Sequence, residues 1–266
     1  MTSSILVTGG TGTLGRLVTP LLRDTGHPVR VLSRRGHDSR DGVEYVTADL
    51  LKGNGIECAL DGSDTVLHLA GAAKGDEEAT RNLVAAASRV GGVRHLVLIS
   101  VIGADLMPLG YFRAKRGAER AVEESGLPWT TLRAAQFNDL VLTATRALAR
   151  LPVVLSPGGV RAQPVDARDV AARLVELTLG EPAGRVPDLA GPKLYGLAEL
   201  IRGYLQARGH GRPTRRPTLP FPVPGKVGRA YRAEDNLALA GADLGTRTWE
   251  DFLAERVEQR ERVARH

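Results

Sequence analysis

The fold is decided close to the N-terminus, by residues 4–22, which read SILVTGGTGTLGRLVTPLL. A strand-like run is followed by Gly9, Gly12 and Gly15, and then by the start of a helical pattern. Glycine is needed where a backbone turns tightly, where a diphosphate approaches the backbone and where a helix packs closely on a strand. The first N–H groups of the helix attract the phosphates. The context of strand, glycines and helix predicts a dinucleotide-binding unit, with a purely structural glycine turn as the alternative.

The first half of the chain alternates short apolar runs with amphipathic stretches, which is typical of a parallel sheet covered by helices. The predicted strands are residues 4–8, 28–33, 43–47, 65–70, 95–100 and 129–134, and the predicted helices are 14–25, 76–90 and 111–125. This order predicts the α/β class, as a Rossmann-type doubly wound parallel sheet with a smaller C-terminal lobe.

After residue 135 the prolines multiply and the alternation is lost. A helix is predicted at 167–180 and another in the C-terminal tail, with Thr248 as its N-cap, whereas 215–228 is too rich in proline for more than short edge pieces. We expect a nucleotide-binding core over 1–135 and a substrate-facing lobe over 136–266. The two are interwoven, so that they form one structural domain overall.

The second predicted strand ends in Ser33, Arg34 and Arg35. An NAD site usually has an acidic residue here for the ribose 2′-hydroxyl, whereas arginine accommodates a 2′-phosphate. The planar guanidinium group is well matched to phosphate. The sequence therefore favours NADP(H) over NAD(H), with an exposed basic turn as the alternative reading.

The bulk composition restricts the class of protein. The 266 residues are 42% hydrophobic and 25% charged, with a net charge of +6, as in ordinary globular proteins. No leader and no bilayer-length apolar run is seen, so we expect a cytoplasmic protein without membrane contact. The basic segment 208–217 has no aromatic residues to stack on bases, which argues against nucleic acid. The single Cys58 excludes an internal disulfide framework, and no metal site is predicted.

Six segments of the chain carry a resemblance to a known family. They are VTGGTGTLGR (7–16), VTADL (46–50), VLHLAG (66–71), LVLIS (96–100), YFRAKRGAERAVEESGLPWTTLRAAQF (111–137) and QPVDARDVA (163–171). Together they resemble the atypical short-chain dehydrogenases/reductases of the NmrA-like group, over nearly the whole length. Asp166 and Asp169 of the last segment look like a metal pair, but Asp169 fits the first turn of the helix that follows.

The resemblance implies where NADP(H) would bind. The glycine loop would hold the diphosphate, with Thr11 near the 2′-phosphate, while Asp49 and Leu50 would border the adenine. The implied cofactor-binding residues are Thr8, Gly9, Gly10, Thr11, Gly12, Thr13, Leu14, Gly15, Ser33, Arg34, Arg35, Asp49, Leu50, Ala70, Gly71, Ala72, Lys115, Ala134, Ala135, Gln136 and Phe137. Asp49 could instead be a turn or cap residue, and Phe137 could be core. His68, inside a strand, is more typical of a satisfied core residue or a cofactor-side residue than of a catalyst.

The resemblance also implies a catalytic set of Ser100, Tyr111 and Lys115. Residues 111 and 115 are four apart and share one helix face. A lysine ammonium would lower the pKa of the tyrosine and contact the nicotinamide ribose, and the tyrosine could then donate a proton to a carbonyl oxygen. Two departures weaken the match: the interval from Ser100 to Tyr111 is short, and Tyr111 could lie on the loop before the helix.

These observations lead to one main functional hypothesis and two rivals. The main one is an NADPH-dependent reductase of a small conjugated substrate, either a quinone, an enone or an aromatic ketone, acting as a monomer or homodimer. The first rival is a non-catalytic NADP(H)-binding redox sensor with a protein partner. The second is a biosynthetic enzyme with a non-redox or internal-redox step.

Overall fold

The computed structural model describes residues 4–39, 41–71, 75–209 and 216–264, with side chains in the last helix described up to residue 256. The chain divides into two compact units. Unit 1 comprises residues 1–105, 109–133 and 170–187, and unit 2 comprises 106–108, 134–169 and 188–266.

Unit 1 is built on a parallel sheet with the strand order β6-β5-β4-β1-β2-β3 and the short β9 beside β6. The strands are β1 (Ile5–Thr8), β2 (Val29–Ser33), β3 (Val43–Thr47), β4 (Thr65–His68), β5 (His95–Val101), β6 (Trp129–Ala134) and β9 (Gly184–Arg185). The strand order reverses at β1, which lies between β2 and β4. In such sheets a ligand binds outside the carboxyl ends of the strands at this reversal.

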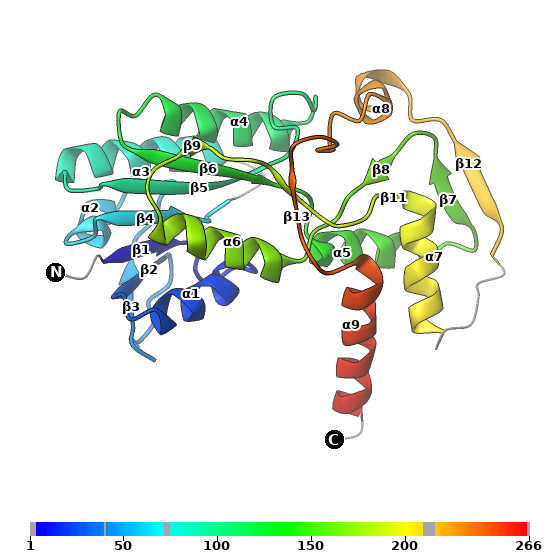
Figure 1. The fold of residues 1–266 in the computed structure, drawn as a ribbon, viewed down its shortest axis with the longest axis horizontal. Helices are drawn as coiled ribbons and strands as arrows, with labels where there is room; N and C mark the ends of the chain where they lie inside the picture. Colours follow the sequence, from blue (N-terminus) through cyan, green and yellow to red (C-terminus); the bar gives the residue numbers. More distant parts are fainter. Residues whose placement is uncertain (1–3, 40, 72–74, 210–215, 265–266) are drawn as a thin grey trace. The chain divides into compact units, whose positions relative to one another are not determined.

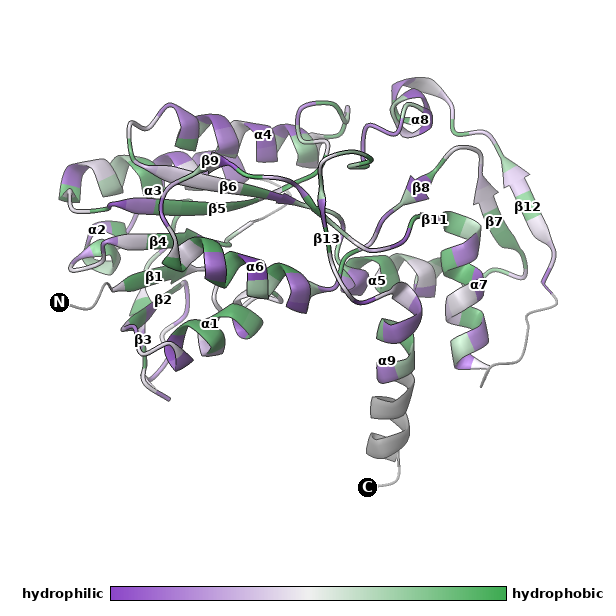
Figure 2. Cartoon of the chain, viewed as in Figure 1, coloured by the Kyte–Doolittle hydropathy of each residue, from purple (hydrophilic) through white to green (hydrophobic). Residues whose placement is uncertain are grey.

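Helices cover both faces of this sheet (Figure 1). On one face lie α3 (Asp76–Val90) and α4 (Gly110–Glu123), and on the other lie α1 (Gly15–Asp24) and α6 (Ala167–Leu179). The short α2 (Ile56–Leu60) precedes β4. With helices on both sides, β1, β4 and β5 are buried along their whole length, and Figure 2 shows most of β5 in green. The predicted Rossmann-type fold is confirmed.

The predicted elements of unit 1 agree with the structure to within about two residues. Helix α3 and strands β3 and β6 have the predicted bounds. Helix α4 ends at Glu123, earlier than predicted, and Gly126 follows with a φ of 72° that suits glycine. Because α4 begins at Gly110, Tyr111 lies in its first turn and not on a preceding loop.

Unit 2 has its own core, formed mainly by three helices. They are α5 (Asn138–Leu148), α7 (Leu197–Arg208) and α9 (Trp249–Ala264), and buried Trp249 packs among them. Three short strand pairs accompany them: β7 (Val154–Pro157) with β12 (Thr218–Phe221), β8 (Arg161–Ala162) with β11 (Tyr195–Gly196), and β10 (Leu189–Ala190) with β13 (Asp243–Leu244). Helix α8 (Gly225–Arg232) starts directly after Pro224, so the expectation of only edge pieces over 215–228 is wrong in its last part.

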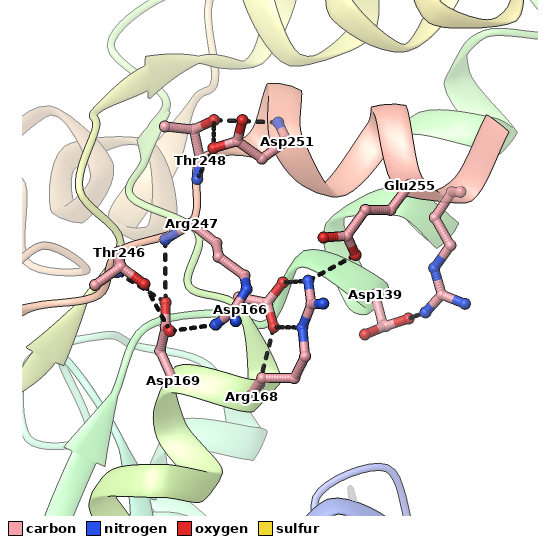
Figure 3. A network of polar contacts seen from close by, with 10 residues as sticks. Asp139, Asp166, Arg168, Asp169, Thr246, Arg247, Thr248, Asp251 and Glu255 are labelled. Atoms are coloured by element: carbon pink, nitrogen blue, oxygen red, sulfur yellow. Dashed lines mark hydrogen bonds and ion pairs between the residues drawn. The ribbon is translucent and has the colours of Figure 1, made fainter. Parts of the chain in front are cut away.

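A polar network joins the start of α6 to the start of α9 (Figure 3). The Asp169 carboxylate accepts hydrogen bonds from the backbone N–H groups of Thr246 and Arg247, at 2.9 and 3.2 Å, and pairs with the Arg247 guanidinium at 2.8 Å. The carboxylate of Asp166 pairs with Arg168 at 2.8 Å. Both aspartates therefore have structural partners.

The N-cap predicted for α9 is confirmed. Thr248 Oγ1 accepts a hydrogen bond from the backbone N–H of Asp251 at 3.1 Å, and the Asp251 carboxylate accepts one from the backbone N–H of Thr248 at 3.0 Å. This reciprocal pair satisfies two donors at the helix end that would otherwise lack partners.

Candidate active site

The glycine loop brings the ends of β1 and β4 together. Gly9 has a φ of 71°, and a Cβ at this position would lie 2.6 Å from the backbone nitrogen of Ala70. A Cβ on Gly15 would overlap Gly10. Neither position has room for a larger residue, so the glycines permit both the tight turn and the close packing of α1 on the loop.

The same loop has room and donors for an anion. Thr11, Gly12 and Thr13 are exposed, and Arg16 Nε holds the loop by donating to the carbonyl of Thr11 at 2.9 Å. Within the described residues, the backbone N–H groups of Thr11, Thr13 and Leu14 have no hydrogen-bond acceptor. No acidic residue lies in the first turn of α1. Free N–H groups at a helix N-terminus with no opposing carboxylate fit a diphosphate.

The turn after β2 presents two cations. Ser33 is buried, and its Oγ accepts a hydrogen bond from the backbone N–H of Arg35 at 3.2 Å, which shapes the turn. Arg34 and Arg35 are exposed, and neither guanidinium pairs with a carboxylate in the part of the chain that the structure describes. Their assignment to a 2′-phosphate stays a prediction.

Asp49 stabilises the turn that follows β3, which is the alternative role that the sequence suggests for it. Its Oδ1 accepts hydrogen bonds from the backbone N–H groups of Leu51 and Lys52, at 3.0 and 3.2 Å, which makes it the acceptor of a turn. Leu50 is buried, and its carbonyl accepts a hydrogen bond from Asn82 at 2.8 Å. The predicted adenine contacts of both residues are not tested by this geometry.

A buried chain of hydrogen bonds runs from β1 through β4 to α3. Thr8 Oγ1 lies 2.6 Å from His68 Nδ1, and Thr80 Oγ1 lies 3.0 Å from His68 Nε2. Thr80 Oγ1 donates to the carbonyl of Asp76 at 2.8 Å, so it accepts from Nε2, and Nδ1 is left as the acceptor for Thr8. Thr8 Oγ1 also accepts from the backbone N–H of Ala70 at 3.2 Å. The histidine is therefore neutral, with its proton on Nε2.

Burial accounts for this neutral state. His68 is fully buried, and its pKa is lowered from 6.5 to about 3, first because burial disfavours the charged ring and then because Lys115 is positively charged. The interpretation of His68 as a satisfied core residue is confirmed.

Lys115 lies beneath the exposed Gly71 and forms a buried ion pair. Its Nζ lies 3.0 Å from Asp76 Oδ2, and the two side chains are 7% and 2% exposed. Nζ also donates to the carbonyl of Ile99 at 3.5 Å. A Cβ on Gly71 would lie 3.0 Å from Nζ. The absence of a side chain at 71 thus leaves the ammonium close to the surface that follows β4.

Helices α3 and α4 lie against each other at Gly117. A Cβ at this position would overlap the side chain of Glu77, which would have to move. The residue before Glu77, Asp76, forms the ion pair with Lys115. No pattern in the sequence singles out Asp76, because it is one of three acidic residues in the first turn of a predicted helix.

Tyr111 lies one turn before Lys115 and is 42% exposed. The pKa of Tyr111 is raised above 10.0, first by burial of part of the side chain and then by the negative charge of Asp76. The expectation that Lys115 would lower this pKa is wrong, because burial raises it and the carboxylate of Asp76 raises it further. The phenol is therefore protonated at neutral pH.

Ser100 is buried near the end of β5, next to an ion-pair cluster. Arg133 binds the Glu119 carboxylate through two hydrogen bonds of 2.7 Å and also reaches Asp105 at 2.9 Å. Burial alone would raise the pKa of Glu119, but the hydrogen bonds and the charge of Arg133 lower it below its ordinary value. Ser100 contributes to the lowering through its position near this carboxylate, although its Oγ has no hydrogen-bond partner among the described residues. Ser100 thus lies beside Glu119, on the same side of α4 as Tyr111 and Lys115.

The other predicted residues belong to unit 2 or fall outside the described residues. Ala134–Phe137 belong to unit 2, where the carbonyl of Gln136 accepts a hydrogen bond from Val165 at 3.1 Å and Phe137 pairs with Val165 in an isolated bridge. Ala72 lies outside the described residues. Within unit 1 the structure therefore assembles Thr8–Gly15, Ala70, Gly71 and Lys115 around the carboxyl ends of β1 and β4.

The described residues contain neither a cluster of metal-binding side chains nor a helix suited to cross a membrane. No group of three or more histidine, cysteine or acidic side chains is arranged to hold a metal ion. None of the helices in this part of the chain combines the length and the apolar character needed to cross a membrane.

Comparisons with known proteins identify the family of this chain. Residues 9–179 match the model of a family described as NAD(P)H-binding. The chain is 36% identical over 224 residues to a (4-alkanoyl-5-oxo-2,5-dihydrofuran-3-yl)methyl phosphate reductase from Streptomyces griseus, covering 79% of this chain and 75% of the relative. It is 30% identical over 218 residues to an NAD(P)H azoreductase from Xenophilus azovorans, with the same coverage of both chains.

The fold also matches a solved structure, the NADPH-dependent quinone oxidoreductase QOR2 from Escherichia coli, with a TM-score of 0.76 and 20% identity over 95% of this chain and 99% of that one. At this identity the match supports the fold alone. The family match covers the glycine loop, the Asp76–Lys115 pair and Ser100, which is most of unit 1. The chain therefore belongs to the NAD(P)H-binding family, as an atypical short-chain dehydrogenase/reductase of the NmrA-like kind.

Proposed function

We propose that this NAD(P)-dependent oxidoreductase uses NADPH to reduce a small conjugated substrate, namely a quinone, an enone or an aromatic ketone. The observation that carries the proposal is the buried ammonium of Lys115 beneath Gly71, with the protonated phenol of Tyr111 one turn away on α4. The relatives are named as reductases, and the name of the Streptomyces griseus protein describes an unsaturated oxo-furan substrate.

NADPH is preferred over NADH in this proposal because of charge. Arg34 and Arg35 follow the buried Ser33 on an exposed turn, and no described carboxylate neutralises them. An additional phosphate on the adenine ribose would gain two charge-assisted partners there. A carboxylate at this position would favour an unphosphorylated ribose, and none is present at residues 33–35.

Each residue of the site has a separate task in this proposal. When bound, NADPH supplies a hydride. The backbone N–H groups of Thr11, Thr13 and Leu14 bind the diphosphate, and Gly71 leaves space for the ribose that Lys115 contacts. Tyr111 donates its phenolic proton to the substrate oxygen, and solvent returns a proton to the phenolate. The hydride brings two electrons and one proton to the substrate, and Tyr111 brings the second proton.

The raised pKa of Tyr111 bears on the substrate class. A phenol with a raised pKa is fully protonated at neutral pH but is a weaker acid. Reduction of a quinone gives a stabilised oxyanion and needs little acid assistance, whereas reduction of an isolated ketone needs more. Quinones and enones are therefore the first substrates to test.

The experiment measures loss of nicotinamide absorbance with a panel of quinones, enones and aromatic ketones, with NADPH and NADH in parallel. We expect turnover with NADPH. The double variant Arg34→Ala/Arg35→Ala should raise KM for NADPH by about tenfold or more and leave KM for NADH nearly unchanged. Tyr111→Phe should slow ketone reduction more than quinone reduction.

Two results would contradict the proposal. Equal use of NADH and NADPH by the unaltered protein would overturn the cofactor preference. Tight binding of NADPH without turnover of any substrate, unchanged in Lys115→Met, would indicate the redox sensor instead.

A further inference from the structure

We infer that Asp76 is the positioning residue for Lys115: its carboxylate holds the ammonium beneath Gly71, where the ammonium can contact the nicotinamide ribose. The inference rests on the proposed function in that it assigns Lys115 to this ribose. Asp76 on α3 then joins the glycine loop and α4 as a part of the cofactor site.

Asp76 is itself held in place from two directions. Its carbonyl accepts the hydrogen bond of Thr80, which is linked through His68 to Thr8 at the end of β1. On the other side, α3 lies against α4 at Gly117. The backbone of Asp76 is therefore fixed relative to the sheet, and its short side chain places the carboxylate 3.0 Å from the ammonium of the long, flexible Lys115 side chain.

Lys115 has no substitute for this partner. Among the described residues, Asp76 is the acid with which the Lys115 ammonium forms an ion pair, and its other acceptor is the carbonyl of Ile99 at 3.5 Å. The neighbouring acids are engaged elsewhere: Glu77 pairs with Arg81 at 3.0 Å, and Glu119 pairs with Arg133 at 2.7 Å.

Donor counting shows what remains for the cofactor. An ammonium has three N–H donors. The Lys115 ammonium forms its ion pair with Asp76 at 3.0 Å and donates one hydrogen bond to the carbonyl of Ile99, and two acceptors cannot occupy three donors. The third remains for a ligand on the side where Gly71 has no side chain. Without the carboxylate, the four-carbon stem would lose its strongest restraint, and a buried ammonium would lack its counter-charge.

The test compares two ligands by calorimetry, NADP⁺ and adenosine 2′,5′-bisphosphate. The second ligand carries the adenine and the 2′-phosphate but lacks the nicotinamide ribose. We expect Asp76→Asn to weaken NADP⁺ binding by about tenfold or more and to leave binding of the bisphosphate unchanged. The same pattern is expected for Lys115→Met.

Glu78→Gln is the matched control. It removes the same charge from the same helix turn, but its side chain is exposed. It should bind both ligands like the unaltered protein. If Asp76→Asn fails to fold, the double variant Asp76→Asn/Lys115→Met, which leaves no unpaired buried charge, should bind NADP⁺ no more weakly than Lys115→Met alone.

Three outcomes would overturn the inference. The first is unchanged NADP⁺ binding in Asp76→Asn. The second is an equal loss of affinity for both ligands in that variant, which would indicate general disruption. The third is a double variant whose loss of NADP⁺ affinity equals the sum of the losses in the two single variants. Failure of the proposed function would look different, because the unaltered protein would then bind NADP⁺ without reducing any substrate. The binding comparison does not depend on turnover, so it distinguishes the two failures.

Discussion

Acidification should destabilise this protein in part through the buried His68. The ring is fully buried between Thr8 and Thr80, with Nδ1 as an acceptor and Nε2–H as a donor. Its pKa in the folded chain is about 3, against 6.5 ordinarily, because burial and the charge of Lys115 both disfavour the imidazolium. As the pH falls, the unfolded chain takes up the proton first. The stability that this ring contributes is therefore complete above pH 6.5 and is lost progressively as the pH falls toward 3.

The size of the effect follows from the two pKa values. One pKa unit corresponds to about 1.4 kcal/mol. At about pH 5 the unfolded histidine is largely protonated and the folded one is not, which lowers the free energy of unfolding by about 2 kcal/mol relative to about pH 7.5. The full loss, reached near pH 3, is about 5 kcal/mol.

The assay is urea unfolding of the unaltered chain and of His68→Gln across this pH range. Glutamine does not titrate, so the stability difference between the two proteins should shrink by about 2 kcal/mol from about pH 7.5 to about pH 5. His37→Gln, at an exposed position, should keep the pH dependence of the unaltered chain. A stability difference that stays constant with pH would refute the argument that His68 is buried and neutral.

Two further predictions concern buried and half-buried ion pairs. Glu119→Gln should lower the free energy of unfolding by about 3 kcal/mol or more, because Arg133 is left buried without its main counter-charge. The double variant Glu119→Leu/Arg133→Met should regain much of this loss. Urea unfolding measures both variants, and a double variant less stable than either single variant would contradict the prediction. Asp169→Ala removes the contacts with Thr246 and Arg247 and should lower the free energy of unfolding by about 1–3 kcal/mol, measured by thermal unfolding. Glu176→Gln breaks an exposed ion pair on the same helix and should lower it by less than about 0.5 kcal/mol. Equal losses in the two variants would contradict the structural role of Asp169.

The sequence predicted those parts of the fold that depend on local pattern. The strand, glycine loop and helix over 4–22 could be predicted because Gly9, Gly12 and Gly15 each meet a local steric demand. The buried parallel strands could be predicted because burial on both faces requires continuous apolar runs. In unit 2 the two-residue strands are too short to show a periodicity in the sequence. Helix α7 is not among the predicted helices, although its residues 197–208 contain an apolar stripe.

The partners within the site could not be predicted in the same way. Asp76 and Lys115 are distant in sequence, and their contact depends on the packing of α3 against α4 at Gly117. The Tyr-x-x-x-Lys spacing was visible, but the direction of the pKa shift of Tyr111 depends on Asp76, which no local pattern assigns to the site. The sequence therefore showed the helix that carries the chemistry but not the charges that surround it.

The face of α4 shows why these charges matter together. Tyr111, Lys115 and Glu119 are each four residues apart and share one side of the helix. Asp76 on α3 holds Lys115, and Arg133 on β6 holds Glu119, so that two separate partners fix the face that carries the tyrosine. Because Glu119 is engaged by Arg133, it is not available to pair with Lys115, and the ammonium stays beneath Gly71. Loss of Asp76 should therefore affect cofactor binding first, whereas loss of Arg133 should affect stability first.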